Sequence, residues 1–180
     1  MRSRDNLAAT RLVQGFSMWR CTKILVPVDF SDTSRAAISA ALQIAADHDA
    51  ELTLIHVEEG MDKEIKKRIY SAPNDTVIED TMAFNEQALR DAAHLELQRA
   101  SEAGEPIPGV KIHTEVVGGD WTEVILTWVD ENEIDLVISG THGRKSGVKG
   151  IFSSKSEKLV AKAPCTVMVV KPQGFPYLRD

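Results

Sequence analysis

The chain has 180 residues, 43% of them hydrophobic and 27% charged, which is typical of a globular protein and excludes disordered and fibrous classes. At this length we expect one domain with one core. The net charge of -6 argues against broad binding to nucleic acid or anionic membranes, and no apolar run approaches the roughly 20 residues that cross a bilayer.

The domain is expected to cover residues 18–172. We expect residues 1–17 to be a poorly ordered N-terminal extension, because a second methionine, Met18, stands just before the first strand-like run and no signal-peptide pattern precedes it. Residues 173–180 are expected to form a C-terminal tail.

Two cysteines, Cys21 and Cys165, form neither a metal-ligand spacing nor a disulfide framework. This usage suits a reducing compartment and predicts a cytoplasmic protein. Neither cysteine is assigned a catalytic role, and no metal site is predicted.

The first predicted element is a strand over residues 23–29, whose near-continuous apolar run is typical of a strand buried on both faces of a parallel sheet. Hydroxyl side chains at residues 31–34 then predict a helix start. We expect that helix to pack closely on the sheet through a flat face of small residues, namely Ala36, Ala37, Ala40, Ala41 and Ile44.

Strands and helices alternate along the rest of the chain, which predicts parallel strands joined by right-handed helical crossovers. The fold class is therefore a single-domain α/β protein with a doubly wound five-stranded parallel sheet and helices on both faces. Alternating residues over 110–117 favour an edge position for that strand. The other predicted elements are a strand over 52–57, a helix over 77–103, a helix over 120–132, a strand over 134–139, a helix over 154–163 and a strand over 166–170. The spacing of Asp120 and Glu123 predicts a cap at the start of the helix over 120–132, and Trp121 and Trp128, seven residues apart, are expected to pack on the sheet.

Ligands of such sheets bind beyond the carboxyl ends of the strands where the strand order reverses, so the loops after the first and fourth strands matter most. They cover residues 27–31 and 140–154. The second loop is rich in glycine and serine, and glycine lets backbone N–H groups approach phosphate at the start of the following helix. Six basic residues against one acidic residue over 140–162 give a local charge of +5. An ordinary solvated turn with surface lysines is an equally weighted interpretation.

Four segments together resemble the universal stress protein family. They are Ile-Leu-Val-Pro-Val-Asp at 24–29, Gly-Thr-His-Gly-Arg at 140–144, Glu-Lys-Leu-Val at 157–160 and Ala-Pro-Cys-Thr-Val at 163–167. The resemblance covers about residues 18–172. It implies a Rossmann-like fold of the adenine nucleotide alpha hydrolase type, and a homodimer through the last strand, that is, through Val167, Met168, Val169 and Val170.

One subgroup of that family carries the motif G-x2-G-x9-G-[ST] and binds ATP, with Mg²⁺ as an accompanying ion. The resemblance implies that Asp29 holds the adenine or nearby ribose groups and that the backbone of Val57 contacts adenine. Glycines of the motif would line the ribose and phosphates, and serines would reach the phosphates. The predicted nucleotide-binding residues, taken from the resemblance and from the basic loop together, are Pro27, Val28, Asp29, Val57, Gly140, Gly143, Arg144, Ser153, Ser154 and Lys155.

The sequence departs from this motif at Ser153, where the family has glycine. A serine adds a Cβ and restricts positive φ, so the backbone approach to phosphate is altered. Lys155 also replaces a usual apolar residue, and its charge is a candidate compensation. Weakened, altered and abolished nucleotide binding all stay open at this point.

Three functions follow, of which the first is preferred: a regulatory homodimer that binds ATP or a related adenine nucleotide. The second is a dimeric interaction protein of the same fold with a degraded site. The third is an enzyme with slow ATP hydrolysis or autophosphorylation at Ser153 or Ser154, although the loop supplies neither a base nor metal-binding carboxylates. Asp29 itself is either a ligand acceptor or a carboxylate that stabilises the first helix.

Overall fold

The computed structural model describes residues 20–59, 76–141 and 154–171 of the chain. All of the predicted strands and helices are present, close to their expected bounds. In chain order they are β1 (Lys23–Pro27), α2 (Asp32–His48), β2 (Glu51–Glu58), α4 (Thr76–Glu102), β3 (Ile112–Gly118), α5 (Trp121–Glu131), β4 (Leu136–Gly140), α6 (Ser154–Lys162) and β5 (Thr166–Val170).

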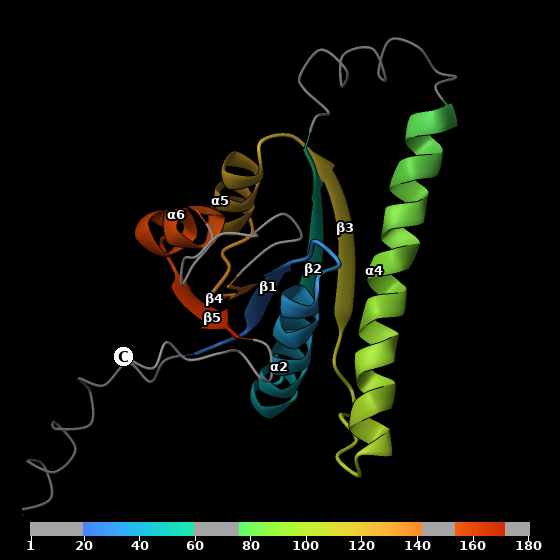
Figure 1. Ribbon diagram of the computed structural model, residues 1–180. Coiled ribbons are helices and arrows are strands. Elements are labelled where there is room, and N and C mark those ends of the chain that lie inside the picture. Colours follow the sequence, from blue (N-terminus) through green and yellow to red (C-terminus); the bar gives the residue numbers. More distant parts are fainter. Residues whose placement is uncertain (1–19, 60–75, 142–153, 172–180) are drawn as a thin grey trace, which may run out of the picture.

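The strands form one five-stranded parallel sheet in the order β3-β2-β1-β4-β5, so the predicted fold class is confirmed. The chain moves outward from β1 through β2 to β3, then returns to place β4 on the other side of β1 (Figure 1). The alternating strand β3 lies at an edge, as its pattern predicts. The order reverses between β1 and β4, and that reversal positions the site.

Two hydrophobic cores fill the two faces of the sheet. Successive β1 side chains alternate between them: Ile24 and Val26 belong to the core under α2 and α4, whereas Leu25 belongs to the core under α5 and α6. All three are fully buried. Figure 1 shows the two helix pairs on opposite sides of the sheet. A strand buried on both faces needs apolar residues at every position, which explains the unbroken run in the sequence.

The buried face of α2 differs from the predicted one. Ala37 and Ala41 face the sheet as expected, but the same face carries the larger residues Ile38 and Leu42. The prediction is wrong for Ala36 and Ala40, which are only half-buried and lie outside the core. Burying isoleucine and leucine removes more apolar area from water than burying alanine, so the helix rotates toward them.

Asp120 caps α5, as its spacing predicts, and its Oδ1 accepts hydrogen bonds from the backbone N–H groups of Thr122 at 2.9 Å and Glu123 at 3.0 Å. Trp121 and Trp128 pack against the core beneath α5, which confirms that they serve packing. Within the described ranges, none of the helices combines the length and apolar character of a membrane span.

Asp135 joins the beginnings of β1 and β4. Its Oδ2 accepts hydrogen bonds from the backbone N–H of Thr22 at 2.7 Å, the Thr22 hydroxyl at 2.8 Å and the backbone N–H of Lys23 at 3.0 Å. Partial burial raises the pKa of this carboxyl, but the hydrogen bonds outweigh burial and leave the pKa below its usual value. The charged form is therefore the one that stabilises the sheet.

We predict that Asp135→Asn lowers the free energy of unfolding at pH 7 by about 1–3 kcal/mol, because three donors lose a charged acceptor. A depressed pKa contributes stability above the unfolded pKa of about 4, and this stability is lost as pH falls through the folded value. Urea denaturation should therefore show the difference between parent and variant shrinking below about pH 4. Exposed Asp130→Asn is the control, with a change within about 0.5 kcal/mol. A difference that stays constant with pH would contradict this role.

Candidate functional site

The carboxyl ends of β1, β2 and β4 lie side by side at the same end of the sheet, because the three strands are adjacent and parallel. Four predicted site residues meet there: Pro27, Val28, Val57 and Gly140. The N–H of Val28 donates to the carbonyl of Ile55 at 2.8 Å, which continues the β1–β2 pairing beyond the end of β1. A crevice outside the strand ends at such a reversal is the usual ligand position in this class of sheet.

Asp29 lies in the turn between β1 and α2. Its Oδ1 accepts hydrogen bonds from the Ser31 backbone N–H at 3.1 Å and the Ser31 hydroxyl at 2.5 Å. The Ser31 hydroxyl also lies 2.9 Å from that of Thr33, and it caps α2 by accepting from the N–H of Ser34 at 3.3 Å. Asp29 thus has the helix-stabilising contact that one hypothesis expects, and it stands at the strand end that the ligand hypothesis requires.

Phe30 and His56 shape the same turn, and sequence analysis did not single them out. Phe30 has φ of 60°, a left-handed conformation that is uncommon outside glycine. His56 Nδ1 donates to the carbonyl of Val28 at 2.7 Å, and its ring lies 4.8 Å from that of Phe30. Glu58 Oε2 lies 3.3 Å from His56 Nε2 and accepts from Asn85 of α4 at 3.1 Å. In the sequence, the signal that could have identified His56 is a histidine within a largely apolar strand.

Gly140 ends β4 directly against the first turn of α2. A Cβ at this position would lie 2.8 Å from the Cβ and Oγ1 of Thr33 and 2.9 Å from its carbonyl carbon. Real Cβ atoms do not approach so closely, so only glycine fits without movement of the helix. The carbonyl of Gly140 accepts a hydrogen bond from the Ser156 hydroxyl at 2.9 Å, which links β4 to α6.

Thr141 follows Gly140 at the head of the loop after β4. Its backbone N–H donates to the carbonyl of Val170 at 3.1 Å, and the residue is fully buried. Among the described residues, its Oγ1 has no hydrogen-bond partner. A buried hydroxyl without a partner costs about 1–3 kcal/mol, so this position suits a polar partner beyond the described residues.

Ser154 and Lys155 begin α6, and Ser154 is exposed. The ammonium of Lys155 lies 2.7 Å from Glu59 Oε2 and 5.4 Å from the centre of the Trp121 ring. The ammonium predicted to contact phosphate is thus paired with a carboxylate of the protein. Gly143, Arg144 and Ser153 lie outside the described residues, and their predicted roles stay predictions.

The described part of the site combines buried apolar residues with a few polar groups. Val28 and Val57 are buried at the ends of β1 and β2, in the cores on opposite faces of the sheet, and Gly140 packs against Thr33 at the end of β4. Hydroxyl groups of Ser31 and Ser154 stand at the starts of two helices, where anions are favoured. Apolar walls with a few polar groups are the ordinary composition of a cofactor site.

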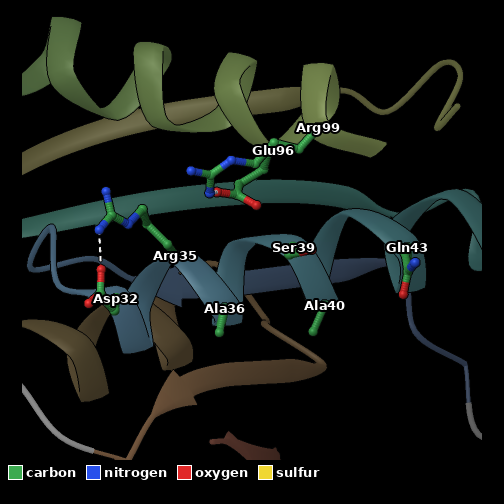
Figure 2. A pocket seen from close by; sticks show the side chains of 8 residues that line it. All are labelled: Asp32, Arg35, Ala36, Ser39, Ala40, Gln43, Glu96 and Arg99. Atoms are coloured by element: carbon green, nitrogen blue, oxygen red, sulfur yellow. Dashed lines mark hydrogen bonds and ion pairs between the residues drawn. The ribbon is translucent and has the colours of Figure 1, made fainter. Parts of the chain in front are cut away.

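An open groove of about 760 Å³ lies between α2 and α4, on one face of the sheet (Figure 2). Arg35 is ion-paired with Asp32, and Arg99 with Glu96 at 2.7 Å, so each cation of the groove is already compensated. This arrangement provides no excess charge for a ligand. The groove is lined by Asp32, Arg35, Ala36, Ser39, Ala40, Gln43, Glu96 and Arg99.

The two cysteines are free thiols. Burial raises the pKa of Cys21 to about 11, with a further contribution from the charge of Asp135, so this thiol is protonated at neutral pH. Burial also raises the pKa of Cys165. Thiolates are the nucleophilic form, so neither environment activates its cysteine. In residues 20–59, 76–141 and 154–171, no group of three or more metal-ligating side chains occurs.

Comparison with known proteins identifies a family. The model of the Universal stress protein family matches residues 21–171. Universal stress protein MJ0531 of Methanocaldococcus jannaschii is 29% identical over 149 residues, which cover 83% of this chain and 81% of that protein. Universal stress protein UspA from Lactobacillus plantarum is 28% identical with a TM-score of 0.56, over 84% of this chain and 98% of that structure.

Two further structures share the fold and hold adenine nucleotides. A universal stress protein in complex with cAMP has a TM-score of 0.57 at 20% identity, over 86% of this chain and 99% of that structure. A universal stress protein family member from Arabidopsis thaliana with AMP bound has a TM-score of 0.52 at 19% identity, over 85% and 93%. At these identities the likeness concerns the fold alone.

We predict that Gly140→Ala destabilises the protein by about 1–3 kcal/mol, because the added methyl group meets Thr33 and forces β4 and α2 apart. Thermal or urea denaturation measures the loss. In a Thr33→Ala background the penalty should shrink without vanishing, since only the Oγ1 contact is removed and the contacts with the Cβ at 2.8 Å and the backbone carbon at 2.9 Å remain. Equal stability of parent and Gly140→Ala would refute the close packing.

Proposed function

We propose, from the premise that this chain belongs to the universal stress protein family, that it is a regulatory protein that binds an adenine nucleotide, with ATP as the first choice. The observation that carries the proposal is that Asp29, Val57 and Gly140 all lie at the carboxyl ends of adjacent strands, where the strand order reverses. We further propose that it acts in the cytoplasm and regulates through binding rather than through efficient turnover.

The nucleotide class is supported by the neighbours of known structure. Their ligands, cAMP and AMP, share an adenosine with one phosphate, so the common fold accommodates that group. In this chain, we place the adenine against the backbone of Val57 and Val28, and the ribose beside Asp29. The phosphates would extend past Gly140 toward Ser154 at the start of α6, where a helix N-terminus favours anions.

Magnesium would enter with the phosphates of ATP. Mg²⁺ commonly retains several waters and binds proteins through one or two carboxylates together with substrate phosphates. We assign Gly143 and Ser153 to the outer phosphates from their positions in the family motif, and Arg144 from the positive charge of the loop, with Pro27 and Lys155 completing the set. Bound magnesium would supply charge neutralisation of the triphosphate.

A second candidate function is a dimeric interaction protein with a degraded nucleotide site. Ser153 favours it, because serine stands where the nucleotide-binding subgroup has glycine. The pairing of Lys155 with Glu59 also favours it, since a candidate compensating charge is engaged inside the protein. Under this alternative, the fold shared with the family would serve partner binding alone.

We expect calorimetric titration of ATP with magnesium into the nucleotide-stripped protein to show saturable binding. Asp29→Asn should weaken it by about tenfold or more, because a charge-assisted hydrogen bond to the ligand is lost. The asparagine retains the oxygen that accepts from Ser31, so the thermal midpoint should change little. Asp29→Ala, which also removes that contact, should lower both affinity and stability.

Two further variants separate the interpretations of the same titration. Ser31→Ala removes a partner of Asp29 without removing the carboxylate, and it controls for effects on the turn. Ser153→Gly should tighten ATP binding about threefold by restoring backbone freedom. No binding by the parent, with binding restored in Ser153→Gly, would support the degraded-site alternative and overturn the first proposal.

Dimerisation through β5 is the proposed assembly. β5 is the edge strand opposite β3, with Met168 40% exposed, and an open apolar edge favours pairing with a second copy. We expect sedimentation velocity at micromolar concentration to give a dimer, and Met168→Glu to shift it toward monomer. Phe84→Glu changes an equally apolar exposed residue on α4 and should leave the dimer intact. A monomeric parent protein would exclude this assembly.

A further inference from the structure

Lys155 and Glu59 form an ion pair between the start of α6 and the end of β2. Lys155 belongs to the first turn of α6, and Glu59 directly follows β2, beyond the proposed adenine contact at Val57. The ammonium lies 2.7 Å from the carboxylate, and the side chains are 43% and 49% exposed. The Trp121 ring supports the same ammonium at 5.4 Å from its centre.

A cation in the first turn of a helix is unfavourable, because the N-terminus of a helix carries partial positive charge. Glu59 compensates for this by bringing a carboxylate to that turn. Asp120 adds a second acidic group: hydrogen bonds from Glu123 and Thr122 lower its pKa, with smaller contributions from the charges of Lys158 and Lys155. Glu59 is therefore the protein's own anion at the helix start where a phosphate would bind.

We propose that Glu59 makes the site discriminate by the number of phosphates on its ligand, by competing with the ligand for Lys155. The inference rests on the proposed function and deepens it. A phosphate group that recruits Lys155 has to displace Glu59 and then lies near its negative charge. Exposed ion pairs contribute little net stability, so a ligand with several charges can displace this one.

The competition predicts an effect that grows with ligand charge. Adenosine carries no phosphate and leaves the pair intact, whereas AMP and ATP present increasing negative charge to Lys155. We expect Glu59→Gln to bind ATP about fivefold more tightly and AMP about twofold more tightly, with adenosine unchanged. Lys155→Met should weaken ATP binding about fivefold and leave adenosine unchanged.

The experiment is calorimetric titration of adenosine, AMP and ATP into the full chain and its variants at low and high salt. Glu59→Gln should raise the affinity for ATP less in the Lys155→Met background than in the parent, because the lysine that pairs with Glu59 is absent. At about 0.5 M salt the gain should fall, since exposed charges are screened. Thermal midpoints of the variants should match the parent, because the pair is exposed.

Glu51→Gln is the matched control. Glu51 lies at the opposite end of β2, is 47% exposed and pairs with Lys111 at 2.5 Å, so it carries the same charge change away from the site. It should leave the affinities of all three ligands unchanged.

The outcomes distinguish this inference from the proposed function. An effect of Glu59→Gln that rises from adenosine to ATP supports the inference. Ligand binding with an equal effect on all three ligands, or with none on ATP, overturns the inference and leaves the proposed function standing. Failure of all three ligands to bind both the parent and the Glu59→Gln variant overturns the proposed function, and the inference with it.

Discussion

The missing side chain at Gly140 sets how closely the end of β4 approaches α2. Thr33 in the first turn of that helix would lie 2.8 Å from any Cβ placed there. The same turn includes Ser31, which caps the helix and bonds Asp29. The end of β4, the start of α2 and the turn after β1 therefore form one packed unit. The position of Asp29 thus depends on the missing Cβ of Gly140, a residue of β4.

A second constraint reaches this unit from β2. His56 bonds the carbonyl of Val28 at 2.7 Å and packs on Phe30, whose left-handed backbone costs free energy. These contacts hold the turn in a conformation that it would not favour in isolation. β2 thus contributes Val57 to the site and also supports the turn that carries Asp29. The turn after β1 is consequently held in place by contacts from both neighbouring strands, β2 and β4.

Local patterns predicted most of the fold, because each strand and helix has its own apolar period and its own start signals. The edge position of β3 followed from its alternation, and the α5 cap from Asp120. Contacts between distant segments had no such signal. The rotation of α2 toward Ile38 depends on the area available against the sheet, and the pairing of Lys155 with Glu59 joins residues far apart in the chain. The residue types suggested a site, but the partners emerged only from the fold.

The two departures from the nucleotide-binding motif both concern the proposed contact with phosphate. Serine at position 153 restricts positive φ more than the glycine of the motif does, and Lys155 is the residue whose charge could offset that loss. Because Lys155 is paired with Glu59, its charge serves a ligand only when that pair opens. A ligand with little charge would meet the altered loop without the compensating lysine, whereas a triphosphate could recruit it. Under the proposed function, Lys155 therefore adds most to the binding of the most highly charged nucleotide, and Glu59 opposes that gain.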